Sequence, residues 1–205
     1  LGRGWVLGET LITGIGQGYI QSTPLQLCMM TAQIANGGYA IKPKIIVDNN
    51  PISYEDAKQS MESGLLFDSS SDTLLDKKLF KNKKNIKIVQ EAMFSSTNER
   101  FGTSYKSRID DPKYQFAGKT GTAQVKRISK RERELDLELE QIPYKDRDHA
   151  LYVAYGPYIN PRYALSIIVE HGGSGSKAAA PIAKKLFKLI IDRHELRNKQ
   201  SNFER

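Results

Sequence analysis

A lysine, two threonines and a glycine stand together within residues 117–125, in the order Lys119, Thr120, Gly121 and Thr122. If this segment is a strand, alternation places Lys119 and Gly121 on one face and Thr120 and Thr122 on the other. An ammonium group and hydroxyls on a strand edge suit the binding of a carboxylate, and a backbone N–H beside Gly121 suits a developing oxyanion. For these residues alone, an exposed lysine in a glycine-rich turn is the alternative, because so short a motif recurs by chance.

The composition narrows the classes of function. The chain has 205 residues and a formal net charge of +8, but its basic residues are scattered and not interleaved with aromatic residues as in a nucleic-acid stacking surface. We therefore expect no nucleic-acid partner. The single cysteine, Cys28, lies among apolar residues and is expected to be a buried structural thiol. The three histidines lack metal-ligand spacing, so the sequence predicts no metal site.

The chain is long enough for one domain or a large part of one. It holds no apolar run of about eighteen residues and no signal peptide. Because the first residue is Leu1, we expect that the chain starts inside a longer product or follows processing, and that any membrane anchor lies upstream. We assign residues 1–198 to one domain with a charged insertion at 126–148, and we expect residues 199–205 to form a frayed tail.

The helix with the clearest sequence signals begins at Pro24. Thr23 and Gln26 have the spacing of a capping box, and proline suits the first helical position. The glycine pair after Asn36 predicts where this helix ends. The glycine-rich residues 1–20 before it predict a loop or a short extended segment.

Two apolar strands at 150–155 and 163–169 are joined by a short turn, which predicts an antiparallel hairpin. A final amphipathic helix is expected at 177–194. We expect the Lys119 strand to lie at one side of the hairpin, with the resulting three antiparallel strands packed against this last helix and the Pro24 helix. The predicted fold class is therefore α+β.

Three further segments give weaker signals. Residues 87–99 have the apolar stripe of an amphipathic helix, whereas residues 48–86 are polar and predict loops with a short strand at most. The insertion at 126–148 carries conflicting periods, so a hairpin extension and an exposed helix both remain open.

Four blocks that occur in one order give the chain a resemblance to a known family. The blocks are residues 13–27 with 34–38, residues 117–125, residues 148–150, and residues 170–173 with 179–181. Together they resemble the class B penicillin-binding proteins, most closely the elongation-type enzymes that crosslink the lateral cell wall. The resemblance implies the α+β transpeptidase fold shared with serine β-lactamases.

The same resemblance implies serine acyl transfer. A serine is acylated by a D-Ala-D-Ala stem peptide and passes the acyl group to an amine of a second stem, and β-lactam antibiotics mimic the first peptide. Lys119, Thr120 and Gly121 match the family's K-[ST]-G motif. Lys119 is thus expected to set the electrostatics of the site, and Thr120, Gly121 and Thr122 to bind the substrate carboxylate. The Thr122 N–H is expected to supply part of the oxyanion hole.

The resemblance further implies no cofactor, a partner in the rod-shape glycosyltransferase machinery, and a location on the periplasmic face of the cytoplasmic membrane. The family's S-x-x-K and S-x-N motifs are expected upstream of this chain, so we expect the nucleophile to lie outside it and the chain alone to be inactive. Two alternatives are a non-catalytic truncated remnant and a β-lactamase or β-lactam sensor of the same fold.

Two segments imitate the absent motifs. Ser174 with Lys177 fits S-x-x-K, and residues 96–98 fit S-x-N, but their order around Lys119 is not that of the family. Ser174 is expected to cap the last helix, and residues 96–98 to be ordinary turn formers at a helix end.

Overall fold

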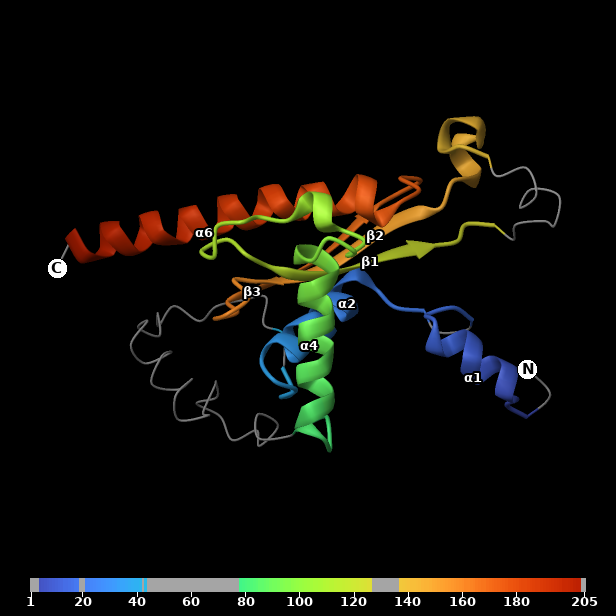
Figure 1. Cartoon of the computed structure of the whole chain (residues 1–205), viewed down its shortest axis with the longest axis horizontal. Helices are drawn as coiled ribbons and strands as arrows, with labels where there is room; N and C mark the ends of the chain where they lie inside the picture. Colours follow the sequence, from blue (N-terminus) through green and yellow to red (C-terminus); the bar gives the residue numbers. More distant parts are fainter. Residues whose placement is uncertain (1–3, 19–20, 42, 44–77, 127–136, 204–205) are drawn as a thin grey trace.

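The computed structural model describes residues 4–18, 21–41, 43, 78–126 and 137–203, with side chains described as far as Arg197. Its centre is an antiparallel sheet of β1 (Ala117–Ala123), β2 (His149–Gly156) and β3 (Tyr163–Val169), in the order β1-β2-β3. Helices cover both faces of this sheet (Figure 1). The expected hairpin, the flanking Lys119 strand and the α+β fold class are confirmed.

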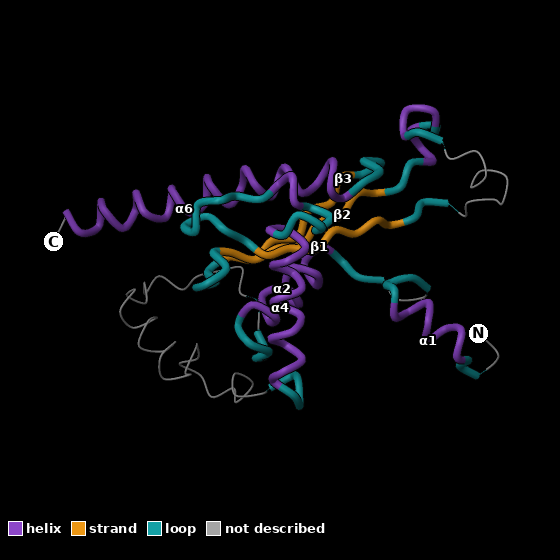
Figure 2. Tube along the Cα trace, in the orientation of Figure 1, coloured by secondary structure: helices purple, strands orange, loops and turns teal. Residues whose placement is uncertain are grey.

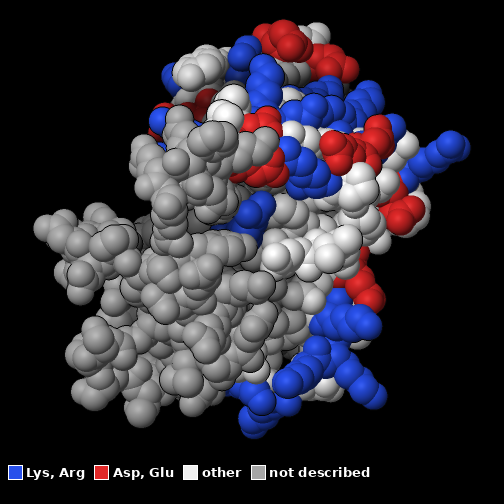
Figure 3. Space-filling model, turned by 90° about the vertical axis from the view of Figure 1, so that its left-hand side faces the viewer, with Lys and Arg blue, Asp and Glu red and all other residues white. Residues whose placement is uncertain are grey.

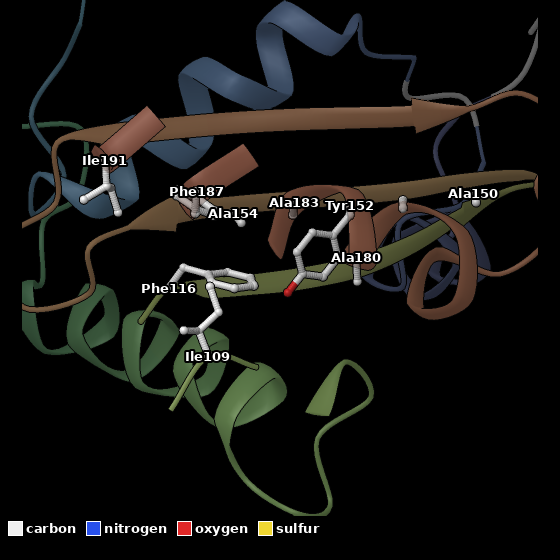
Figure 4. Close-up of a cluster of buried hydrophobic side chains, with 10 residues drawn as sticks. Ile109, Phe116, Ala150, Tyr152, Ala154, Ala180, Ala183, Phe187 and Ile191 are labelled. Atoms are coloured by element: carbon white, nitrogen blue, oxygen red, sulfur yellow. The ribbon is translucent and has the colours of Figure 1, made fainter. Parts of the chain in front are cut away.

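One face of the sheet packs against α6 (Ala180–Phe203), which continues from a π-helical turn at Gly175–Ala179. Small alanines on the helix let it lie close to the strands, and the rings of Phe116 and Phe187 stack with centroids 4.8 Å apart (Figure 4). The buried members of this core are Ile109, Phe116, Ala150, Tyr152, Ala154, Ala179, Ala180, Ala183, Phe187 and Ile191.

The last helix is longer than expected. It continues past His194 to Phe203, into the residues for which we expected a frayed tail. Residues 182–203 contain neither glycine nor proline, so no residue in this stretch interrupts the backbone ladder of the helix.

The opposite face of the sheet packs against α2 (Pro24–Ala35) and α4 (Lys83–Asn98), which lie side by side below the strands (Figures 1 and 2). The capping box of α2 is present, because the Gln26 N–H donates to Thr23 Oγ1 at 3.2 Å and the Thr23 N–H donates to Gln26 Oε1 at 2.8 Å. The helix of residues 87–99 is confirmed but begins four residues earlier, where the Asn82 side chain caps it.

Residues 4–18 correct an expectation, since they contain α1 (Leu7–Gly14) where we expected a loop. The Val6 N–H donates to Glu9 Oε2 at 2.8 Å, and Trp5 Nε1 donates to Thr10 Oγ1 at 2.8 Å. The two glycines of α1 lie in its first turn and at its last position, where they disturb the helix least. The glycine content therefore misled the prediction.

The charged insertion lies between β1 and β2. Residues 127–136 and most of residues 48–86 lie outside the described part of the chain. The described end of the insertion forms two short 3-10 turns, Leu139–Gln141 and Tyr144–Asp146, rather than a long helix. Acidic and basic side chains are intermingled over the upper part of the face in Figure 3, as the scattered charge of the sequence predicts.

Candidate active site

The strand β1 lies at one side of the sheet. Within the described part of the chain it pairs only with β2, so alternate backbone groups point outward along its other edge. Lys119 and Thr122 are exposed, and Thr120 and Gly121 are half-buried. The residues expected to bind substrate are therefore together on an open strand edge.

The register assigns each side chain to a face. Lys119 lies opposite Val153 and Thr120 lies opposite Tyr152, so these two neighbours point to opposite faces of the sheet, as expected. Lys119 nevertheless reaches around the edge, because its Nζ donates to the Thr120 carbonyl oxygen at 2.8 Å and lies 3.4 Å from Thr120 Oγ1. The ammonium group and the Thr120 hydroxyl can thus contact the same ligand group.

The Thr120 hydroxyl continues into a chain of hydroxyls that was not predicted from the sequence. Thr120 Oγ1 lies 3.2 Å from Thr103 Oγ1, which lies 3.2 Å from Ser96 Oγ at the end of α4. Gly102 makes this approach possible: a Cβ at that position would lie 2.5 Å from the Ser95 carbonyl oxygen and closer still to that of Ser96. The glycine before Thr103 was the available sequence signal.

A second, fully buried set of hydroxyls lies next to this chain. Tyr152 OH is 2.9 Å from Thr97 Oγ1 and 3.1 Å from Ser104 Oγ, and all three side chains are at most 1% exposed. Burial raises the pKa of Tyr152, and the hydrogen bonds with Ser104 and Thr97 offset part of this rise. This cluster fastens α4 and the turn after it to the sheet directly behind Thr120.

The same cluster explains the glycine that precedes Lys119. A Cβ at Gly118 would lie 2.5 Å from Cζ of the Tyr152 ring and closer still to the hydroxyl oxygen. Only glycine leaves room for the Tyr152 ring to pack against β1 at this position. Residues 96–98 therefore serve the packing of α4: Thr97 bonds Tyr152, and Asn98 Nδ2 donates to the carbonyl oxygens of Phe94 and Phe116 at 3.0 Å each.

Two histidines join the third and fourth sequence blocks. The His171 N–H donates to His149 Nδ1 at 2.9 Å, and His171 Nδ1 lies 3.0 Å from the Arg147 carbonyl oxygen. His171 has a φ of +54°, which is rare for a residue with a side chain. The Gly173 N–H donates to the Asp148 carbonyl oxygen at 2.8 Å, so the start of β2 holds the loop after β3 at two points.

After this loop, the π-helical turn packs directly against the backbone of β1 and β2. A Cβ at Gly175 would lie 2.7 Å from the Gly121 carbonyl oxygen and closer still to that of Leu151. Ser174 occupies the position before the turn but does not cap it with its side chain, contrary to our expectation. Its hydroxyl lies 2.9 Å from Ser176 Oγ, and its carbonyl oxygen instead accepts from the Lys177 N–H at 3.1 Å.

Cys28 is half-buried rather than fully buried as we expected, but its contact is structural. Its Sγ donates to the Ala164 carbonyl oxygen of β3 at 3.4 Å, and burial raises its pKa. In the described residues, no group of three histidine, cysteine or acidic side chains is placed to hold a metal ion. Across the same residues, no helix combines the length and the apolar character needed to span a membrane.

Residues 1–188 match the family model of the penicillin binding protein transpeptidase domain. The chain belongs to this transpeptidase family. Penicillin-binding proteins thus account for the four sequence blocks, and the structure brings three of them together around β1 and β2. The matched residues include the open edge of β1, the chain of hydroxyls that ends at Thr120, the buried hydroxyl cluster at Tyr152 and the histidine pair.

Relatives narrow the branch to the elongation type, penicillin-binding protein 2. The chain is 30% identical over 194 residues to a peptidoglycan D,D-transpeptidase MrdA of Salmonella typhimurium and 32% identical over 191 residues to that of Haemophilus influenzae, covering 93% of this chain in each case. The chain spans only 28% and 27% of the length of these two relatives.

Solved structures agree. The chain superposes on penicillin-binding protein 2 of Pseudomonas aeruginosa, in complex with WCK 5153, with a TM-score of 0.65 and 33% identity, over 91% of this chain and 34% of that one. It superposes on penicillin-binding protein 2 of Helicobacter pylori, in complex with MreC, with a TM-score of 0.62 and 32% identity, over 91% of this chain and 29% of that one.

Proposed function

We propose that this chain forms the substrate-binding wall of a peptidoglycan D,D-transpeptidase of the elongation type. The observation that supports it is the open edge of β1, where Lys119, Thr120 and Thr122 meet solvent within a matched family domain. The chain supplies a cation, hydroxyls and free backbone groups on one edge, which suit a peptide that ends in a carboxylate.

In this proposal a serine from another part of the protein attacks the carbonyl carbon between the two D-alanines. Its oxygen forms an ester with the penultimate residue, and the terminal D-alanine leaves with a proton on its amine. Lys119, Thr120 and Thr122 hold the terminal carboxylate beside Gly121, and the Thr122 N–H stabilises the oxyanion, a contribution of about 3 kcal/mol to the transition state. An amine of a second stem then attacks the ester, and the serine regains its hydroxyl.

A β-lactam enters the same cycle as a mimic of the first peptide. Its ring carbonyl acylates the serine, and its carboxylate occupies the place of the terminal D-alanine carboxylate. By analogy with the Helicobacter pylori protein that was solved with MreC, we also propose a partner in the rod-shape machinery. The intact protein would act on the periplasmic face of the cytoplasmic membrane, with its anchor upstream of Leu1.

The test is covalent labelling by a fluorescent penicillin. The full-length protein that contains this chain should be labelled, and the isolated chain should not, because the nucleophile is assigned elsewhere. Lys119→Ala should slow labelling by at least about tenfold, since it removes a charged hydrogen bond to the ligand. Lys188→Ala, an exposed lysine on α6, is the matched control.

Three outcomes contradict parts of the proposal. A full-length protein that is not labelled refutes the transpeptidase assignment and favours a non-catalytic remnant. Labelling of the isolated chain would show that the nucleophile lies within it. Sustained hydrolysis of the penicillin by the full-length protein would favour a β-lactamase instead.

A further inference from the structure

The chain of hydroxyls from Ser96 through Thr103 to Thr120 can run in either of two directions, because each hydroxyl can donate or accept. We propose that Thr103 is a positioning residue, which orients the Thr120 hydroxyl so that its proton points at the substrate carboxylate. This inference rests on the proposed function of the β1 edge. It assigns the charge specificity of the site to a residue outside the strand.

The donors and acceptors of these groups leave two possible directions for the chain of hydroxyls. A lysine ammonium group only donates, so Thr120 Oγ1 acts as an acceptor toward Lys119 Nζ, 3.4 Å away. Each hydroxyl has a single proton. If Thr120 donates its proton to Thr103, its oxygen presents only lone pairs to the open edge, and these repel a carboxylate.

The reverse arrangement suits an anion. When Ser96 donates to Thr103 and Thr103 donates to Thr120, the Thr120 proton is left for the ligand. A carboxylate therefore selects this direction, and hydrogen bonds in a chain of this kind strengthen one another. A neutral acceptor gains less from it, because hydrogen bonds to ionised groups are about twice as strong as those between neutral groups.

The position of Thr103 is built into the fold. On its two sides, the Gly102 N–H donates to the Glu99 carbonyl oxygen at 2.8 Å and the Ser104 N–H donates to the Ser96 carbonyl oxygen at 3.0 Å. The Ser104 hydroxyl is tied to Tyr152 in the buried cluster. Thr103 itself is exposed, so the core does not need its side chain and the hydroxyl is free to serve the edge.

The experiment compares two probes on the full-length protein: a fluorescent penicillin with its free carboxylate, and the methyl ester of the same compound. The measured quantity is the ratio of their second-order acylation rate constants. Thr103→Val keeps the shape of the side chain but removes the hydroxyl, and it should lower this ratio about tenfold, the effect of weakening one hydrogen bond to a charged group. Thr103→Ser should restore the ratio to within about twofold of wild type, the residual cost of removing one exposed methyl.

Ser96→Ala is the second variant, because it removes the start of the chain without touching Thr103. It should lower the ratio in the same direction and by less. Equal slowing of both probes by Thr103→Val would mean a merely structural role and would overturn the inference, as would an unchanged ratio. A wild-type protein that reacts with neither probe refutes the proposed function instead, so the two failures are distinguishable.

Discussion

Gly118→Ala tests whether the buried tyrosine beneath β1 determines the residue before the lysine. The new Cβ would lie 2.5 Å from Cζ of Tyr152 and nearer still to its hydroxyl, well inside van der Waals contact. The tyrosine cannot retreat easily, because it is 1% exposed and its hydroxyl is hydrogen-bonded to Thr97 and Ser104. Either the ring moves and loses these partners, or β1 moves away from α4.

The expected cost follows from these contacts. Overpacking a closed core costs about 1–3 kcal/mol. Two buried hydrogen bonds, at 2.9 and 3.1 Å, contribute about 1 kcal/mol each. We therefore expect Gly118→Ala to lower the free energy of unfolding by about 3–5 kcal/mol. Acylation by penicillin should fall with it, because Lys119 is the next residue on the strand.

The assay is urea unfolding of the full-length protein in a double-mutant cycle. Tyr152→Leu removes the ring, so Gly118→Ala should cost at least about 2 kcal/mol less in that background. Tyr152→Phe should give little relief, since the ring carbon at 2.5 Å remains. Gly8→Ala, where a Cβ meets nothing within 4 Å, is the control. A cost below about 1 kcal/mol, or one that is the same in the leucine background, refutes the reasoning.

Three further predictions concern other parts of the chain. Gly175→Ala should push the π-helical turn off Gly121 and reduce penicillin acylation at least about tenfold, and unchanged labelling would contradict this contact. Cys28 should react with iodoacetamide more slowly in the native than in the urea-unfolded protein, because partial burial raises its pKa; equal rates would argue against this shielding. The hydrogen bond from the Tyr114 hydroxyl is the largest cause that lowers the pKa of Asp192 below its usual 3.8, and Lys113 lowers it further. The Asp192 carboxylate therefore stabilises the fold above that pH, and this stability is lost as the pH falls through the folded pKa. Tyr114→Phe should therefore flatten the fall in melting temperature below about pH 4, and an unchanged slope would count against it.

The elements with local signals were predictable. Thr23 and Gln26 specify the start of α2, and the glycines after Asn36, with φ values of +85° and +94°, specify its end. The alternation of β2 and β3 predicted the hairpin. These features depend on contacts between residues close in sequence, so the chain itself encodes them.

Some predictions were wrong because a local signal was interpreted without its position in the structure. The helix α1 was missed because its two glycines were counted without knowledge of their positions in the helix. The side-chain cap assigned to Ser174 was wrong because a π-helical turn follows it, and Ser176 takes its hydroxyl. The last helix was predicted to end near His194 but continues to Phe203, since residues 182–203 contain neither glycine nor proline.

The sequence by itself determined the family resemblance, the sheet and the ribbon of Lys119, Thr120 and Thr122. Only the tertiary structure decided what supports that ribbon. Thr103 reaches Thr120, and His149 reaches His171, across 17 and 22 residues of chain. The physical reason is that a hydroxyl or imidazole gains a partner only when the backbone places it within about 3 Å, and no spacing rule along the chain specifies that distance.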